Sequence, residues 1–152
     1  MLRPVQANDV PLLYEHQADA EAAAMVGFAP RSRAEHDAHW ARILSDDSLI
    51  ALAIVDDAGR LAGHIASWTD TGDRLVGYWI DRELWGQGHA TAALRELLEL
   101  VTERPLVALV AETNHGSIRV LERCGFVTVG KHQLPGDPVV EVRMVLEDDA
   151  QP

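Results

Sequence analysis

The stretch of residues 75–101 constrains the fold most, because its periodicity changes from that of a strand to that of a helix. Up to Ile80, β-branched and aromatic residues alternate with others, which is typical of a strand. From Ala90 onward, apolar residues recur at three- and four-residue spacing and charged residues fall on the other side. This pattern predicts an amphipathic helix that follows the strand after a short link.

The link has small residues at Gly86, Gly88 and Ala90, where the helix must begin. A helix N-terminus carries backbone N–H groups without intrahelical partners and the positive end of the helix dipole, so it can hold an anion. Small residues keep that backbone accessible, which suits a phosphate or pyrophosphate. The pattern matches neither the phosphate loop that ends in Gly-Lys-Ser/Thr nor the dinucleotide fingerprint. Tight turning alone also explains glycines at such a link, so both interpretations stay open.

A second strand and helix follow and strengthen the interpretation of the link as a ligand site. Residues 106–110 are strand-like, and residues 114–126 have the pattern of a short helix. Asn114 suits the N-cap position, and Gly125 suits the left-handed conformation that ends many helices.

The segments GYWIDRELWGQGHATAAL and NHGSIRVLERCGF together resemble the acyl-CoA-binding core of the GNAT superfamily of N-acetyltransferases. Within this superfamily, the first segment resembles the branch that acetylates the N-termini of ribosomal proteins, together with the relatives of that branch that act on small amines. The superfamily's loop reads Arg/Gln-x-x-Gly-x-Gly/Ala, and Trp85, Gly88 and Ala90 stand at its defined positions here. The resemblance covers residues 2–146, with specific motifs in the second half only.

The chain length and composition predict a single acetyltransferase domain over residues 1–147, followed by an acidic tail at 148–152. With 152 residues, 47% of them hydrophobic, the chain can bury one substantial core. No apolar run approaches the ~20 residues that span a bilayer, and the N-terminus lacks the hydrophobic region of a signal peptide. Cys124 is the single cysteine, which excludes an internal disulfide. We therefore expect a cytoplasmic protein without a membrane partner.

The net charge of -11 argues against a nucleic-acid partner, because binding to phosphate backbones needs a basic surface. It favours a cationic partner such as an amine, although an acidic surface also serves solubility alone. Coenzyme A is itself a polyanion. Its phosphates can still be held by backbone N–H groups together with Arg82, Arg119 or Arg123.

The remaining pattern predicts an α/β (α+β) mixed sheet of about six to seven strands with helices on both faces. Helices are expected at residues 8–19 and 32–44, the second with a capping box formed by Ser32 and Glu35. The resemblance implies that strands 74–80 and 105–111 are the splayed parallel pair at the centre of the sheet. The expected strands are 2–5, 49–55, 61–69, 74–80, 105–111, 126–132 and 139–146.

The resemblance also implies which residues bind acetyl-CoA. The backbone amides of Trp79 and Ile80 would align the thioester, and Asn114 would contact the pantetheine arm. Ser117 and Arg119 complete this cofactor set. The phosphate cradle would consist of Gln87, Gly88, His89, Ala90 and Thr91.

For the acceptor, the family places the pocket wall in the helix-loop-helix segment near the N-terminus. By resemblance, Phe28, His39 and Trp40 are candidates for substrate binding, and Glu112 sits at a strand end near the acceptor entrance. His36 and His39 are three residues apart but have no carboxylate at ligand spacing. Such a pair is more often a solvated face than a metal site, so we expect no metal.

Amide formation requires that the protonated amine loses a proton and attacks the thioester carbonyl while the oxyanion is stabilised. Many family members protonate the leaving thiolate with a tyrosine seven residues after the asparagine, but Leu121 stands there and cannot donate a proton. In the ribosomal-protein branch a serine three residues after the asparagine serves, and Ser117 occupies that place. A serine in the first turn of a helix is also an ordinary capping residue.

The general base is left open by the sequence. His64 lies in the strand beside the splayed one and has an ordinary pKa suited to near-neutral chemistry. Deprotonation relayed by water is an equal alternative. Asp70 lies at a strand end, near the expected acceptor entrance, and is a further candidate.

The leading hypothesis is transfer of an acetyl group from acetyl-CoA to a primary amine, either a peptide N-terminus or a small polar amine, by direct attack in a ternary complex. Two alternatives stay open: a coenzyme A-binding regulatory module without turnover, and a nucleotide-binding enzyme that uses the glycine-rich link. The missing Lys-Ser/Thr argues against the latter. A homodimer is an open expectation, because dimers are frequent in this family.

Overall fold

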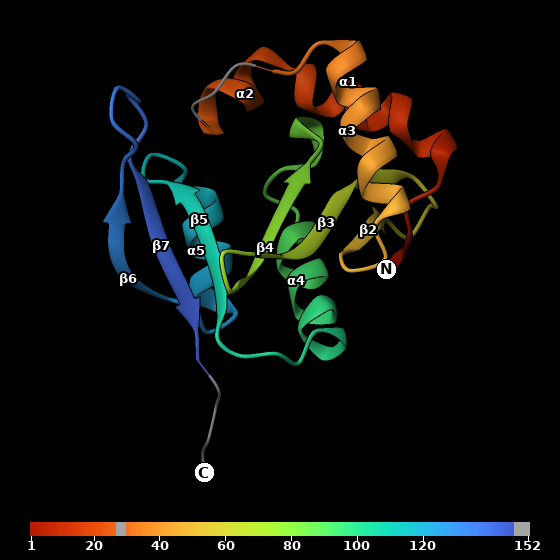
Figure 1. The fold of residues 1–152 in the computed structure, drawn as a ribbon. Coiled ribbons are helices and arrows are strands. Elements are labelled where there is room, and N and C mark those ends of the chain that lie inside the picture. The colour runs from red at the N-terminus through yellow and green to blue at the C-terminus, as the bar shows by residue number, and fades with distance from the viewer. Residues whose placement is uncertain (27–29, 148–152) are drawn as a thin grey trace.

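The structure, a computed structural model, describes residues 1–26 and 30–147 (Figure 1). Phe28 and the acidic tail at 148–152 lie outside the described residues. The chain forms a mixed sheet with the order β1-β2-β3-β4-β5-β7-β6, in which the last two strands are exchanged relative to their order in the chain. The strands are β1 (Leu2–Pro4), β2 (Ile50–Val55), β3 (Leu61–Asp70), β4 (Asp73–Ile80), β5 (Leu106–Ala111), β6 (Val127–His132) and β7 (Glu141–Leu146).

Helices cover both faces of the sheet, as the sequence predicts (Figure 1). The helices α1, α2 and α3 lie over one face, where α1 contacts β3 and β4, while α4 contacts the same strands from the other face and packs against α5. Segment 20–26 forms a helix of its own. The helices are α1 (Val10–Ala18), α2 (Ala20–Val26), α3 (Arg33–Ser45), α4 (His89–Leu100) and α5 (His115–Arg123), with short 3-10 turns at Ala7–Asp9 and Arg82–Leu84.

Local signals in the sequence set the helix ends. Ser32 and Glu35 form the expected capping box, in which Ser32 Oγ accepts from the Glu35 amide. The Asn114 side chain caps α5 by accepting from the Ser117 amide at 3.2 Å. Gly125 follows α5 with φ of 97°, a conformation that glycine adopts without strain.

Two hydrophobic clusters hold the layers together. The larger one joins the sheet to α4 and α5 and includes Leu94, Leu97, Leu121 and Phe126, all nearly inaccessible to solvent. A second cluster around Trp40 joins α1 and α3 to the other face. Burial on both faces gives the sheet the rigidity with which its central strands can hold a site.

The central parallel pair separates soon after it begins. Strands β4 and β5 pair only at Arg74 with Leu106 and at Leu75 with Val107. Beyond that point β4 stays paired with β3, and β5 stays paired with β7 through Ala111. The C-terminal halves of β4 and β5 therefore diverge, which confirms the splayed pair expected from the family resemblance.

Candidate active site

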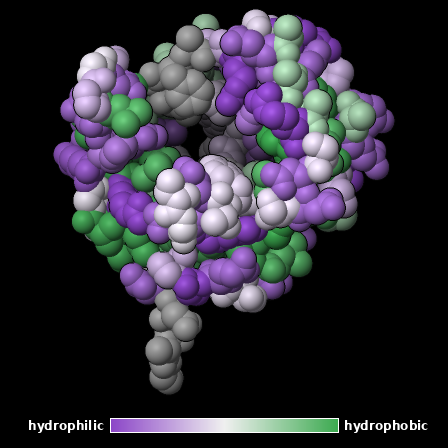
Figure 2. Space-filling model, viewed as in Figure 1, coloured by the Kyte–Doolittle hydropathy of each residue, from purple (hydrophilic) through white to green (hydrophobic). Residues whose placement is uncertain are grey.

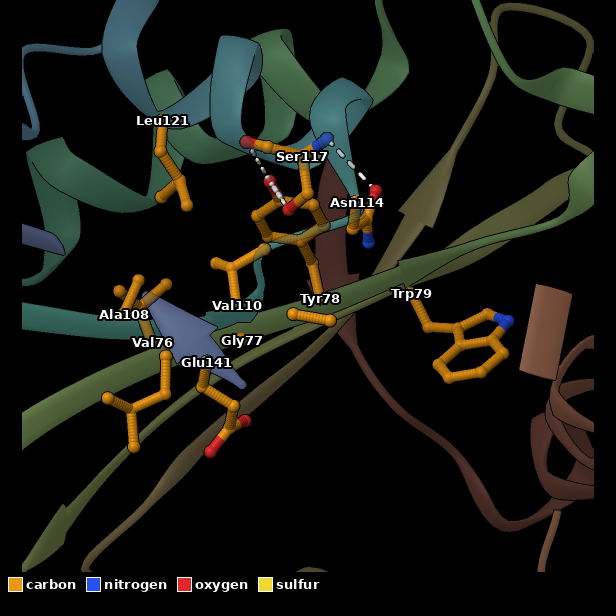
Figure 3. Close-up of a pocket in the computed structure, with 12 residues that line it drawn as sticks. Val76, Gly77, Tyr78, Trp79, Ala108, Val110, Asn114, Ser117, Leu121 and Glu141 are labelled. Atoms are coloured by element: carbon orange, nitrogen blue, oxygen red, sulfur yellow. Dashed lines mark hydrogen bonds between the residues drawn. The ribbon is translucent and has the colours of Figure 1, made fainter. Parts of the chain in front are cut away.

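A cavity of about 170 Å³ lies where β4 and β5 diverge. Its lining comes from β4, from β5, from α5 and its N-cap, and from the start of β7 (Figure 3). Figure 2 shows this side of the molecule hollowed between the half that carries β5 and β7 and the half that carries α1 and α3. The opening follows from the missing β4–β5 pairing, which leaves a gap that neighbouring strands would otherwise close.

The register of β3 and β4 decides which backbone groups face this gap. The Asp81 amide donates to Ala62 O at 2.8 Å, and two residues earlier Trp79 lies opposite His64. Hydrogen-bonded pairs alternate with other pairs in an antiparallel ladder, so Trp79 also directs its amide and carbonyl groups to β3. We expected the Trp79 amide to align a thioester, and the register contradicts that role because the amide belongs to the ladder.

The amides of Tyr78 and Ile80 instead point toward β5, since they alternate with that of Trp79. No β4–β5 pairing is formed at this height. The carbonyl of Ile80 turns to the same side and accepts from Trp85 Nε1 at 3.0 Å. Two N–H groups thus project into the gap, and that of Ile80 is one of the two amides that the family resemblance implies.

Gly63 permits the close approach of β3 and β4 at this point. A Cβ atom on Gly63 would lie 2.0 Å from Trp79 O and 3.0 Å from the Cα of Ile80. Both neighbours are backbone atoms and cannot rotate away. Glycine at this position therefore maintains the register that directs the amides of β4.

A pair of hydroxyl groups lies on the α5 side of the cavity (Figure 3). The Tyr78 hydroxyl is 2.6 Å from Ser117 Oγ and 3.2 Å from the Ser117 carbonyl oxygen. Burial raises the pKa of Tyr78 to about 12. When Tyr78 donates to Ser117 Oγ, the serine keeps its own proton for a ligand in the cavity.

Sequence reasoning missed Tyr78. In the sequence Tyr78 belongs to the same alternating strand pattern as Val76 and Ile80, and its half-buried ring packs with them against the core. Its hydroxyl partner lies 39 residues further along the chain, so periodicity alone cannot reveal the contact. Leu121, at the family's tyrosine position, is only 1% exposed, packs in the core and also lines the cavity.

The glycine-rich link is open to solvent, as a phosphate cradle requires. Gly88 is the N-cap of α4 with φ of 85°, and Gly86 has φ of 76°. No atom lies within 4 Å of a Cβ built on either glycine. The first helical hydrogen bond runs from the Ala92 amide to Gly88 O, so the amides of His89, Ala90 and Thr91 have no partner inside the helix.

The two segments that carry the resemblance come together at this end of the sheet. Helix α5 packs against α4, and Cys124 Sγ lies 4.0 Å from Thr91 O. Arg119 is exposed on α5 and does not line the cavity. Arg82, by contrast, donates to the Asp19 carboxylate at 2.9 and 3.0 Å. The Gln87 side chain donates to Glu83 O at 3.4 Å.

His64 lies on the face covered by α1 and α3. Its ring meets the Trp40 ring edge-on at 5.0 Å, and burial together with neighbouring histidines and Arg31 lowers its pKa to about 3. A group with so low a pKa is a poor general base near neutrality. The structure does not bring His64 into the cavity.

The other acceptor candidates do not gather at the cavity. Trp40 is 3% exposed in the core beneath α3, so the expectation that it contacts an acceptor is wrong. His39 is half-buried beside it, and burial lowers its pKa to about 4. Asp70 pairs with Asp73 in the β3–β4 hairpin, at the end of β4 opposite the cavity, which contradicts its placement at the acceptor entrance. Glu112 directly follows the cavity-lining Ala111, and its carboxylate lies 2.9 Å from Lys131 Nζ.

Within the described ranges, no three His, Cys, Asp or Glu residues are grouped so that they could hold a metal ion. Nor does any helix in those ranges have the length and apolar character needed to cross a membrane.

Comparison with known sequences assigns the chain to a family. Residues 1–127 match the family described as Acetyltransferase (GNAT) domain. The chain belongs to the GNAT family of N-acetyltransferases. A comparison with curated proteins yields no match. Nothing in the match singles out the ribosomal-protein branch to which the first segment bears a resemblance.

Solved structures share the fold over nearly the whole chain. The spermidine N-acetyltransferase from Vibrio cholerae in complex with CoA and spermine superimposes with a TM-score of 0.81, at 18% identity, over 97% of this chain and 94% of that one. The aminoglycoside acetyltransferase AAC(6')-Ib in complex with coenzyme A gives a TM-score of 0.80, at 22% identity, over 99% of this chain and 95% of that one. At these identities the likeness confirms the mixed GNAT fold.

Proposed function

We propose that this protein transfers the acetyl group of acetyl-CoA to a primary amine by direct attack in a ternary complex. The observation that carries this proposal is the gap between β4 and β5, into which the amides of Tyr78 and Ile80 project beside an open helix N-terminus. Similar folds are those of enzymes named for spermidine and for aminoglycosides, so a small polyamine-like acceptor is favoured over a peptide N-terminus. We further propose that residues 1–147 act as one domain.

The binding of acetyl-CoA follows from the geometry of the link. The amides of His89, Ala90 and Thr91 would hold the pyrophosphate at the positive end of α4. Arg119 is better placed than Arg82 to meet further phosphate, because Arg82 is already bound to Asp19. The pantetheine arm would then run along β4 to Asn114, whose side-chain amide nitrogen lies toward the cavity in Figure 3.

In the reaction, the neutral amine nitrogen forms a bond to the thioester carbonyl carbon, the carbon–sulfur bond breaks, and the nitrogen releases a proton to water. One of the N–H groups of Tyr78 and Ile80 would hold the carbonyl oxygen, on which negative charge develops. Such donors are effective because strand β4 fixes them before the substrate binds. No covalent intermediate with the protein is required.

The Tyr78 and Ser117 hydroxyls would serve the leaving thiolate. With a pKa of about 12, Tyr78 is a far weaker acid than a thiol, whose ordinary pKa is ~8.5. Full transfer of the tyrosine proton to sulfur would thus be unfavourable by roughly 5 kcal/mol. We infer that Ser117 donates a hydrogen bond to the thiolate, with Tyr78 orienting it, and that sulfur takes its proton from solvent.

The test is a thiol-release assay with purified protein, acetyl-CoA and three acceptors: spermidine, an aminoglycoside and a peptide with a free N-terminus. Saturable release of coenzyme A with one of them, together with the acetylated amine in a mass spectrum, is the expected result. Saturable binding of acetyl-CoA without release for any acceptor would favour a regulatory module that binds coenzyme A without turnover.

A further inference from the structure

Glu141 brings a carboxylate to the cavity that sequence reasoning did not single out. It begins β7 opposite Ala111 of β5, and both residues line the cavity. Residues directly opposite each other in a ladder share a face of the sheet. On β5 that face also carries Val107, which packs with Leu75 of β4. Leu75 and Trp79 are four residues apart in β4, so their side chains lie on the same face of the sheet. Glu141 therefore shares that face with both of them.

This is the face covered by α1 and α2, opposite the hydroxyl pair. Trp79 Nε1 donates to the carbonyl oxygen of His16 in α1 at 3.2 Å, whereas Tyr78 reaches α5 on the other side. Figure 3 shows the Glu141 carboxylate pointing away from Ser117 and Tyr78. The same cavity is lined by the hydroxyl pair and by Glu141. An acetyl donor on the α5 side and an amine acceptor on the Glu141 side can therefore meet between the strands.

The charge of Glu141 is not compensated within the described part of the chain. The charges near it are compensated by ion pairs. Glu112 lies 2.9 Å from Lys131, and Arg143, two residues along β7, lies 3.2 Å from Asp73. Glu141 itself forms no ion pair in residues 1–26 and 30–147, although it is half-buried. A partly desolvated carboxylate without a partner favours the binding of a cation.

The surroundings of Glu141 suit an organic cation. The Trp79 side chain lies at the cavity and is held in place by its hydrogen bond to α1. Gly77 lets the Trp68 ring lie against β4, since a Cβ there would be 3.1 Å from the ring. Both rings lie on the face of the sheet that carries Glu141, and aromatic faces attract ammonium groups.

We propose that Glu141 is a specificity-determining residue, which binds a second, non-reacting ammonium group of the acceptor and thereby selects primary amines that carry a further positive charge. The inference rests on the proposed acetyl transfer, and it adds the residue and the charge by which the acceptor is recognised. Glu141 holds the acceptor on the face opposite the coenzyme A thiolate, so it acts on acceptor binding and not on acetyl-CoA binding.

The experiment compares Glu141→Gln with the unchanged protein and with Glu99→Gln, which removes the same charge from an exposed position on α4. Spermidine is the probe, and its binding is measured by calorimetry in the presence of coenzyme A, independently of turnover. We expect Glu141→Gln to weaken spermidine binding roughly tenfold or more, as for loss of a charge-assisted contact, while Glu99→Gln leaves it within about twofold. Acetyl-CoA affinity stays unchanged in both variants.

The acceptor's kcat/KM should fall in parallel with binding, mainly through a higher KM. Spermidine binding should also depend less steeply on ionic strength in Glu141→Gln. Equal spermidine affinity in Glu141→Gln and the unchanged protein would overturn the inference. Spermidine binding that depends on Glu141 without any coenzyme A release would instead refute the proposed function while leaving the cation site in place.

Discussion

The contact that most directly tests the geometry of the site is the approach of Gly63 to β4. Replacing Gly63 with alanine places a Cβ 2.0 Å from Trp79 O and 3.0 Å from the Cα of Ile80. A normal carbon–oxygen contact is ~3.3 Å or longer, so the strands must move apart by more than an ångström. The atoms involved are all backbone, and the displacement must break neighbouring bonds of the β3–β4 ladder.

We expect Gly63→Ala to cost about 3 kcal/mol, the upper part of the range for overpacking a rigid core. In a chain of this size that lowers Tm by roughly 6–12 °C. The matched control is Gly130→Ala in β6, where nothing lies within 4 Å of the new Cβ. Its Tm should stay within about 2 °C of the unchanged protein, because surface substitutions cost little.

The assay is thermal unfolding followed by circular dichroism, with urea unfolding to obtain the free energy. The variant should also lose acetyl-transfer activity at temperatures where it is still folded, since the displaced segment carries the Ile80 amide. If Gly63→Ala had the same Tm as Gly130→Ala and kept its activity, the close packing of β3 on β4 would not determine the geometry of the site.

Three further predictions concern the cofactor loop, the hydroxyl pair and the histidines. Gly88→Glu should abolish acetyl-CoA binding in a fluorescence or calorimetric titration while the fold is kept, because it adds charge and strain at a left-handed residue; unchanged affinity would show that the loop is not the cradle. Tyr78→Phe should lower kcat roughly fivefold at constant KM for acetyl-CoA, the effect of about 1 kcal/mol, whereas an unaltered kcat would contradict the orienting role with Ser117. Because the pKa of His64 is lowered to about 3 and that of His39 to about 4, the unfolded chain binds more protons below its ordinary histidine pKa of ~6.5. Stability should therefore decrease as pH falls from about 6.5 toward 4, and Tm values that stay level over that interval would refute the burial of these rings.

The parts of the fold that depend on nearby residues could be read from the sequence. The apolar spacing after Ala90 predicts α4, and Asn114 and Gly125 mark the two ends of α5 as they stand in the structure. Each of these signals acts within one or two turns of the chain. The open glycine-rich link belongs to the same class, since its glycines lie next to the helix they begin.

The parts that depend on register could not be read in this way. A strand pattern says that Trp79 and Ile80 alternate, but only the hydrogen bond from Asp81 to Ala62 shows which of their amides faces β5. The sequence places Asp70 at the end of a strand. It does not show that this end lies beside the start of β4, away from the cavity. Residue type and spacing contain neither fact.

The same reasoning explains why the two missed residues, Tyr78 and Glu141, are those that complete the cavity. Both lie in strands that also contribute to the core, so their periodic pattern indicates packing. Their polar groups reach a cavity only because the pairing between β4 and β5 stops after Leu75 and Val107. The space that opens there is lined by side chains from both faces of the sheet. The open loop alone could hold any phosphate, and a carboxylate alone any cation. In the proposed reaction, it is the gap between the strands that lets an acyl donor and an amine meet at the amides of β4.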